Sequence, residues 1–111
     1  MWVTNVYDVE EEKVEGVENV TIRWVIDEKV GAKNFAMRYF VIKQGGETPL
    51  HTHDWEHEMF VVKGEGYISD GKNKTKIKAG DAIFVDSNEP HQVINEDSPT
   101  LEIICLIPLS K

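Results

Sequence analysis

The sequence predicts an all-β protein that closes into a sandwich or barrel. Short runs of β-branched and aromatic residues recur along its 111 residues, with glycine, proline or aspartate between them, which gives about nine or ten strands. No segment has the apolar spacing of an amphipathic helix. Apolar residues make up 41% of the chain, which suffices for one core, so we expect residues 1–111 to form a single domain.

The first half of the chain contains two clear strand signals. The acidic run 10–13 is typical of a solvated loop. Residues 21–26 are β-branched and aromatic, and they end at a charged, glycine-containing turn over 27–31. A second, longer strand is expected over 35–43, and the glycine pair 45–46 breaks it.

The second half predicts a series of shorter strands separated by turns. Asp70-Gly71 suits the positive backbone angles of a tight hairpin turn, and the alternating lysines after it look exposed. A glycine turn, a proline turn and an acidic turn separate the strands that follow. The expected strands are 57–64, 65–69, 72–78, 82–85, 92–94 and the apolar 101–107.

Three of the four histidines lie within seven residues, at positions 51, 53 and 57. In an extended strand His51 and His53 project to the same side, roughly 6.5 to 7 Å apart, so their imidazoles can converge on one ion. His57 keeps the same parity and opens the next strand, and His91 follows a proline turn. A lone histidine is more often a structural residue, but this clustering favours a metal site made of His51, His53, His57 and His91.

Charge and composition limit the partners. The chain carries 20 acidic and 12 basic residues, and its net charge of -8 argues against nucleic acid and anionic membranes. No apolar stretch reaches the ~18 residues of a membrane span, and the N-terminus lacks signal-peptide character. We therefore expect a soluble cytoplasmic protein. The single cysteine, Cys105, has no partner for an internal disulfide.

Two glycine-bounded motifs resemble those of the cupins. The first covers 45–64 and the second 80–95; their matching residues are Gly45, His51, His53, His57 and Gly64, then Gly80, His91 and Asn95. The resemblance implies a double-stranded β-helix, a jelly-roll barrel, with the metal in its mouth. It points to the small single-domain cupins with four histidine ligands, of the manganese type. Several of these are homodimers, so we expect a homodimer, which light scattering would test.

The chain departs from the usual cupin motifs in two places. Most metal cupins have a glutamate where this chain offers His57 or the adjacent Glu58. Gly64 is the seventh residue after His57, as the motif requires, and parity also favours His57 inside and Glu58 outside. Asp86 and Asn88 replace a proline and a glycine, which alters the turn before the last histidine.

Four neutral imidazoles would leave a divalent ion its full positive charge, so an anionic ligand should bind it well. An octahedral ion would keep two open positions beside each other. We expect one divalent transition metal ion. The resemblance favours manganese, with iron as the nearest alternative, whereas affinity for imidazole rises toward nickel and copper; zinc is a further alternative.

Several residues near these motifs are candidates for a substrate pocket. Arg38 shares a strand face with apolar neighbours, where it either anchors a substrate carboxylate or forms an ion pair at the surface or a dimer interface. Cys105 either lines the pocket or is a structural thiol, and Trp55 either forms the rim or packs a turn. The tentative pocket is Arg38, Phe40, Trp55, Val93, Ile103, Cys105 and Ile107.

The leading functional hypothesis is a metal-dependent oxidoreductase of dioxygenase type that acts on a small, partly apolar molecule. The histidines would hold the ion, and no other protein residue need be catalytic. A non-catalytic, metal-dependent binding module for a small ligand is the alternative. A sugar isomerase or epimerase ranks last because it needs a general base, for which Tyr67 or an acidic side chain would have to serve.

Overall fold

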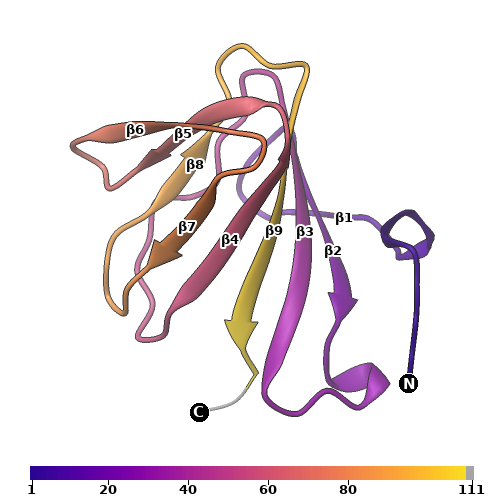
Figure 1. The fold of residues 1–111 in the computed structure, drawn as a ribbon. Coiled ribbons are helices and arrows are strands. Elements are labelled where there is room, and N and C mark those ends of the chain that lie inside the picture. The colour runs from indigo at the N-terminus through magenta and orange to yellow at the C-terminus, as the bar shows by residue number, and fades with distance from the viewer. Residues whose placement is uncertain (110–111) are drawn as a thin grey trace.

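The computed structural model describes residues 1–109, which form two antiparallel β-sheets with short connections (Figure 1). No α-helix occurs among these residues, and the all-β prediction is confirmed. The strands are β1 (Glu12–Lys13), β2 (Val20–Ile26), β3 (Phe35–Lys43), β4 (His57–Lys63), β5 (Glu65–Ser69), β6 (Lys74–Lys78), β7 (Ala82–Val85), β8 (Gln92–Ile94) and β9 (Thr100–Pro108).

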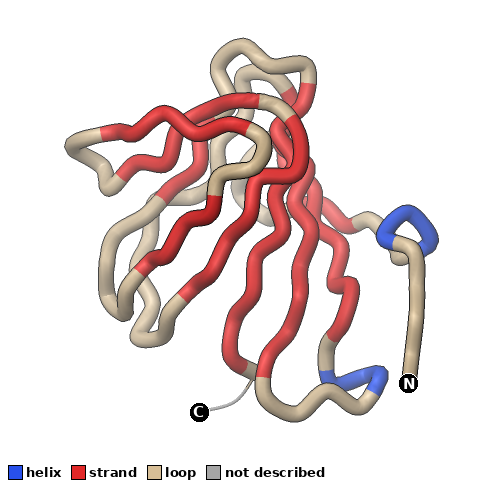
Figure 2. Tube along the Cα trace, viewed as in Figure 1, coloured by secondary structure: helices blue, strands red, loops and turns tan. Residues whose placement is uncertain are grey.

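The larger sheet has the strand order β1-β2-β3-β9-β4-β7, and the smaller has the order β6-β5-β8. The last strand, β9, therefore lies in the middle of the large sheet between β3 and β4, and Figure 2 shows these strands side by side. Because β9 joins β3 to β4, the inward faces of these strands form one continuous wall.

Neither short helix of residues 1–109 has the length or apolar content to cross a membrane.

The observed strands follow the expected ones closely, and no end differs by more than two residues. The acidic run 10–13, expected to be a loop, contains the two-residue strand β1, which pairs with Thr21 and Ile22 of β2. Two single 3₁₀ turns, η1 (Val6–Asp8) and η2 (Glu28–Val30), complete the elements. The short β1 was not predicted because its pairing with β2 is a tertiary contact, with no apolar pattern of its own.

The core lies on the inner side of the strands, where alternate residues are apolar. Along β9 the side chains of Leu101, Ile103 and Cys105 are at most 1% exposed. The buried cluster also draws on both sheets, which it joins. Its members are Val20, Ile42, Met59, Val61, Ile77, Val85, Val93, Leu101, Ile103 and Cys105.

Two buried polar residues tie the connections to the sheets. Asn95 is fully buried, donates to the carbonyls of Ile42 and Ser98 at 2.8 and 3.0 Å, and accepts from the Ser98 amide at 3.0 Å. On the outer face the Glu102 carboxylate accepts from Tyr39 at 2.6 Å and from Tyr7 at 3.3 Å. The Tyr7 hydrogen bond holds the N-terminal segment against the large sheet.

Candidate metal centre

Backbone pairing between two connections brings the histidines together. The amide of His51 donates to the carbonyl of His91 at 3.3 Å, and the amide of His91 donates to the carbonyl of His51 at 3.1 Å. The amide of Asn88 donates to the carbonyl of His53. Asn88 has φ of 64°, a left-handed conformation that asparagine tolerates in place of the glycine of the motif. The altered turn therefore still holds the two loops together.

The expectation that His51 and His53 share one regular strand is wrong. His51 forms only an isolated bridge with His91, and His53 lies outside any strand. Their rings nevertheless converge, with centroids 4.3 Å apart in an edge-to-face arrangement. Two isolated bridges, Glu47 with Ile94 and His51 with His91, hold this segment in place of a continuous ladder. The side chain of Thr48 and the amide of Asn88 supply further hydrogen bonds.

Three histidines offer ligand atoms that all lie within 4.8 Å of one another: His51, His53 and His91. Two nitrogens bound at about 2.1 Å to one ion are at most about 4.2 Å apart, so this spacing is close to what a shared ion needs. The Nδ1 atom of His91 donates to the carbonyl of Glu89 at 2.9 Å, which leaves its Nε2 atom free to ligate. The three imidazoles therefore form a donor set that could hold a divalent metal.

His57 lies beside this trio at the start of β4 and is 3% exposed. Its ring centroid is 4.6 Å from that of His91 and 5.1 Å from that of His53. The neighbouring Glu58 is exposed on the opposite face of β4, where it lines a groove with Phe60 and Phe84. The structure thus places His57, and not Glu58, beside the other histidines, while its role as a ligand remains a prediction.

The electrostatics of the cluster suit a metal. Burial, together with the neighbouring histidines and the Arg38 charge, lowers the pKa values of His51 and His53 and lowers the pKa of His57 to about 3. These imidazoles are therefore neutral, as metal ligation requires. The Nδ1 atom of His57 is buried and has no hydrogen-bond partner within residues 1–109. Neutral nitrogen donors and an orphaned ring nitrogen fit a bound divalent ion.

The metal-free protein is expected to lose stability as the pH falls below about 6.5. The unfolded His57 takes up its proton near a pKa of 6.5, but the folded one only near about 3, so the unfolded state binds more protons in between. Stability therefore rises with pH across this range, by at most about 1.4 kcal/mol per pH unit for this group. Urea unfolding between about pH 4 and pH 7 measures the slope. A His57→Leu variant should give a shallower slope, and identical slopes would contradict the assignment.

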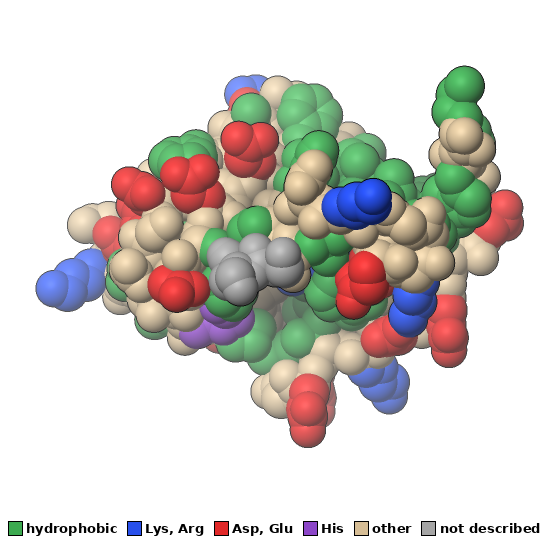
Figure 3. Space-filling view, turned by 90° about the horizontal axis from the view of Figure 1, so that it is seen from below, with side chains coloured by type: hydrophobic (Ala, Val, Ile, Leu, Met, Phe, Trp, Pro, Cys, Tyr) green, Lys and Arg blue, Asp and Glu red, His purple; other side chains and the backbone are tan. Residues whose placement is uncertain are grey.

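A cavity of about 410 Å³ opens beside the histidines, with mostly apolar walls. Figure 3 shows histidine and apolar side chains together at the lower end of the molecule. All seven tentative pocket residues line this cavity. The sequence analysis did not identify the other residues that line the cavity. The alternation of β2 places Ile22 and Trp24 on one face and could have indicated these two. The missed residues are Val14, Ile22, Trp24, Ile42, Thr48, Pro49 and Met59.

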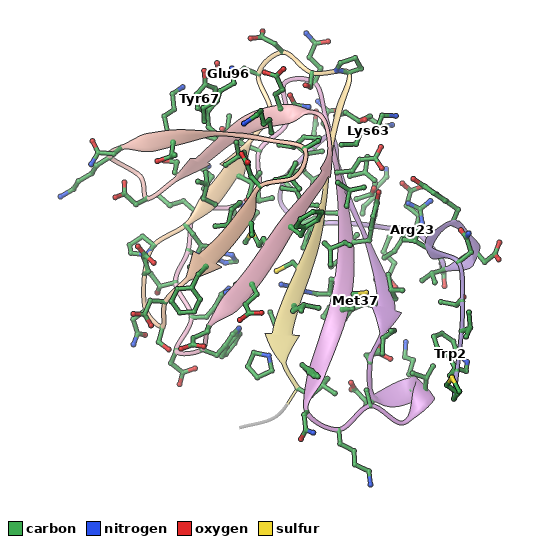
Figure 4. All side chains as sticks on the ribbon, viewed as in Figure 1. Trp2, Arg23, Met37, Lys63, Tyr67 and Glu96 are labelled. Atoms are coloured by element: carbon green, nitrogen blue, oxygen red, sulfur yellow. The ribbon has the colours of Figure 1, made fainter. Side chains whose placement is uncertain are left out.

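The part of the chain that the structure describes brings no aspartate, glutamate, lysine or tyrosine to the cavity wall. Tyr67, named as a possible base, lies on β5 beside Glu96 at the top of the molecule, where the ammonium group of Lys74 is 4.3 Å from its ring centroid (Figure 4). Apart from the histidines, the titratable or charged side chains that line the cavity are those of Arg38 and Cys105. This wall does not favour a reaction that needs a carboxylate or phenol as base.

Two facing β-sheets with a histidine cluster at the mouth of an apolar cavity define a β-barrel protein with a candidate metal site. The chain belongs to the cupin family: the family model described as a cupin domain, Cupin_2, matches residues 38–107. The expected double-stranded β-helix is thereby confirmed.

Two solved structures resemble nearly the whole chain. The polyketide cyclase RemF from Streptomyces resistomycificus has 31% sequence identity and a TM-score of 0.92, over 99% of this chain and 80% of that one. A predicted oxalate decarboxylase from Thermotoga maritima has 27% identity and a TM-score of 0.84, over 98% of this chain and 100% of that one.

Among curated proteins, an oxalate-binding protein from Thermotoga maritima is 38% identical over 66 residues, which cover 59% of this chain and 54% of the relative. An uncharacterized protein from Methanocaldococcus jannaschii is 29% identical over the same length, 59% of this chain and 53% of the relative. The chain thus spans about half the length of the curated relatives it matches.

Proposed function

We propose that the protein is a divalent-metal-dependent enzyme that acts on an enolisable, partly apolar polycarbonyl molecule. The observation that carries this proposal is the cavity of about 410 Å³, whose walls are mainly apolar and which has the histidine cluster at its mouth. Such a cavity suits a molecule with several rings or a folded chain better than a two-carbon dianion, which would leave the apolar walls without contacts.

The four histidines would hold the ion through neutral nitrogens, as proposed above. A divalent ion at this position supplies Lewis-acid stabilisation of negative charge on a carbonyl oxygen. The apolar walls exclude water from the bound molecule, and Trp24 and Phe40 flank its rings. Since the described residues bring no carboxylate to the cavity wall, a substrate that is itself acidic suits this site, and β-dicarbonyl compounds exist in water partly as enols. The absence of a carboxylate or phenol base from the described wall thus agrees with this substrate class.

Intramolecular carbon–carbon bond formation is the reaction we place first. The support is the similarity to the polyketide cyclase RemF, which extends over 99% of this chain. In such a ring closure the enol carbon of one dicarbonyl unit attacks a carbonyl of another, and water leaves. The chain would contribute by folding the substrate against its apolar walls, so that the two reacting carbons meet.

Oxygenation of the same class of substrate, a dioxygenase activity, is the second candidate. The observation that favours it is the all-imidazole donor set, which suits redox-active ions such as iron(II). Manganese remains the metal we propose, with iron, nickel, copper and zinc as alternatives. The homodimer also remains a proposal, supported by the exposed Phe60 and Phe84 on the outer face of the large sheet.

The test incubates the manganese-, iron(II)- and zinc-loaded protein with linear poly-β-ketones, β-diketones, flavonols and oxalate. Ring closure gives a product that has lost water without oxygen uptake, and it should proceed with zinc as well as with manganese. Dioxygenation gives oxygen uptake and products that carry both oxygen atoms, and it should fail with redox-inert zinc. If only oxalate binds and no compound turns over, the enzyme proposal is wrong and the protein is a binding module.

A further inference from the structure

The buried side-chain donors that lack a partner gather at the cavity. Within residues 1–109, four buried side-chain nitrogen or oxygen atoms have no hydrogen-bond partner: Thr21 Oγ1, Arg38 Nε, Trp55 Nε1 and His57 Nδ1. Two of them, Arg38 Nε and Trp55 Nε1, are N–H donors of residues that line the cavity, and His57 Nδ1 belongs to the candidate metal centre. A buried donor without a partner costs about 1–3 kcal/mol, so a site that collects them is suited to a ligand that supplies acceptors.

Arg38 has a defined position in the cavity wall. In the sheet register it lies between Trp24 on β2 and Cys105 on β9. Its Nη2 atom donates to the sulfur of Cys105 at 3.0 Å. Its guanidinium carbon lies 5.5 Å from the Trp24 ring centroid and 5.1 Å from that of Phe40. Two aromatic rings and a thiol thus hold the guanidinium group, and its Nε–H has no hydrogen-bond partner within residues 1–109.

The positive charge of Arg38 has no counter-ion in the described chain, because no carboxylate of residues 1–109 lies within 4.0 Å of it. Burial raises the pKa of the Cys105 thiol, so the thiol stays neutral and does not balance the charge. A cation in an apolar cavity is costly unless an anion joins it. The position inside the cavity also argues against the surface ion pair that the sequence left open.

Arg38 also lies close enough to the histidine cluster for its charge to act on His51, His53 and His57. A fixed cation beside a divalent metal weakens metal binding by repulsion. The arrangement becomes favourable when one anionic ligand lies between the two positive groups. The position of Arg38 close to the histidine cluster therefore indicates that the cavity binds an anion.

The Trp55 indole supplies the second donor and a flat surface. Its ring stacks on that of His53, with centroids 4.6 Å apart and planes 8° apart. Its Nε1–H is buried and has no partner in the described part of the chain. Together with Trp24 and Phe40, this ring gives the cavity aromatic surfaces that suit a planar ligand.

We infer that the cavity selects a flat aromatic anion, with one acidic oxygen bound by Arg38 and a second acceptor oxygen bound by the Trp55 indole. This inference rests on the proposed function and narrows its substrate class to polycarbonyl molecules that carry an aromatic ring and bind as enolates. Neutral molecules of the same shape should bind less well, because they leave the guanidinium charge without a counter-ion.

The test compares 2-naphthoate with methyl 2-naphthyl ketone, a neutral molecule of similar shape, by calorimetry on metal-free and zinc-loaded protein. We expect 2-naphthoate to bind the wild-type protein at least about 10-fold more tightly than the ketone in both forms. Arg38→Met should weaken 2-naphthoate binding at least about 10-fold and ketone binding by less than about 3-fold. Trp55→Phe should weaken binding of both probes by about 3-fold or more, since it removes the indole donor together with part of the aromatic surface.

Lys33→Met, which removes an exposed positive charge in a loop, is the matched control and should leave both affinities unchanged. Metal content and thermal unfolding check that Arg38→Met remains folded. Equal affinity of the wild-type protein for the two probes would overturn the inference, even if the variant fails to fold. Naphthoate binding that requires zinc and does not depend on Arg38 would assign the anion site to the metal alone. Because the metal-free comparison involves no turnover, a failed activity screen does not affect it.

Discussion

Replacing His91 by alanine is expected to lower the affinity for the bound metal at least about 100-fold, because loss of a direct ligand should cost more than loss of the groups that orient one. His91 belongs to the three histidines whose ligand atoms lie within 4.8 Å, and its Nδ1 hydrogen bond to Glu89 fixes the ring. The measurement is elemental analysis of protein purified without a metal-affinity tag. We expect near-stoichiometric metal in the wild type and little in the variant.

The same measurement on His57→Ala and Glu58→Ala decides the fourth ligand. Loss of metal in His57→Ala, with retention in Glu58→Ala, is the expected result, because His57 is buried beside the cluster and Glu58 is exposed on the outer face. The opposite pattern would mean that β4 is shifted by one residue, so that Glu58 and not His57 faces the histidine cluster. Retention in all three variants would show that the histidine cluster is not the metal site.

The sequence predicts strand order along the chain better than it predicts neighbours in space. Alternation over 101–107 correctly separates Ile103 and Cys105 from Glu102, because the period of a strand is local. The contact between Arg38 and Cys105 depends on the pairing of β3 with β9, 67 residues apart in sequence. Such a register is set by the whole barrel, so sequence reasoning placed both residues in the pocket without predicting that they touch.

The histidine site was also predicted only in part, because its residues were identified but their contacts were not. Motif spacing selected all four histidines, but the geometry that joins His51 to His91 is an isolated bridge between two connections. Propensity does not determine such a bridge, because only two residues pair and the flanking hydrogen bonds come from the side chain of Thr48 and the amide of Asn88. The stacking of Trp55 on His53 is equally a tertiary contact.

Gly64→Ala is expected to destabilise the fold by more than about 4 kcal/mol, the range reached when backbone strain and a steric clash coincide. Gly64 joins β4 to β5 with φ of 89°, which an L-residue adopts at a cost of about 1–2 kcal/mol. An added Cβ would also lie far inside the van der Waals distance of the carbonyl oxygen of Thr100. Because that oxygen belongs to the backbone at the start of β9, it cannot move without disturbing the central strand.

Gly80→Ala provides the matched control, since Gly80 has φ of 97° but open space where the Cβ would lie. It carries the backbone strain without the clash, so its cost should stay near about 1–2 kcal/mol. Urea unfolding of the soluble variants measures the difference, and the yield of soluble protein serves where Gly64→Ala fails to accumulate. If the two variants differ by less than about 1 kcal/mol, the close approach of β9 to this turn does not explain the glycine. A large difference would mean that the motif glycine is required for packing against β9, independently of any metal.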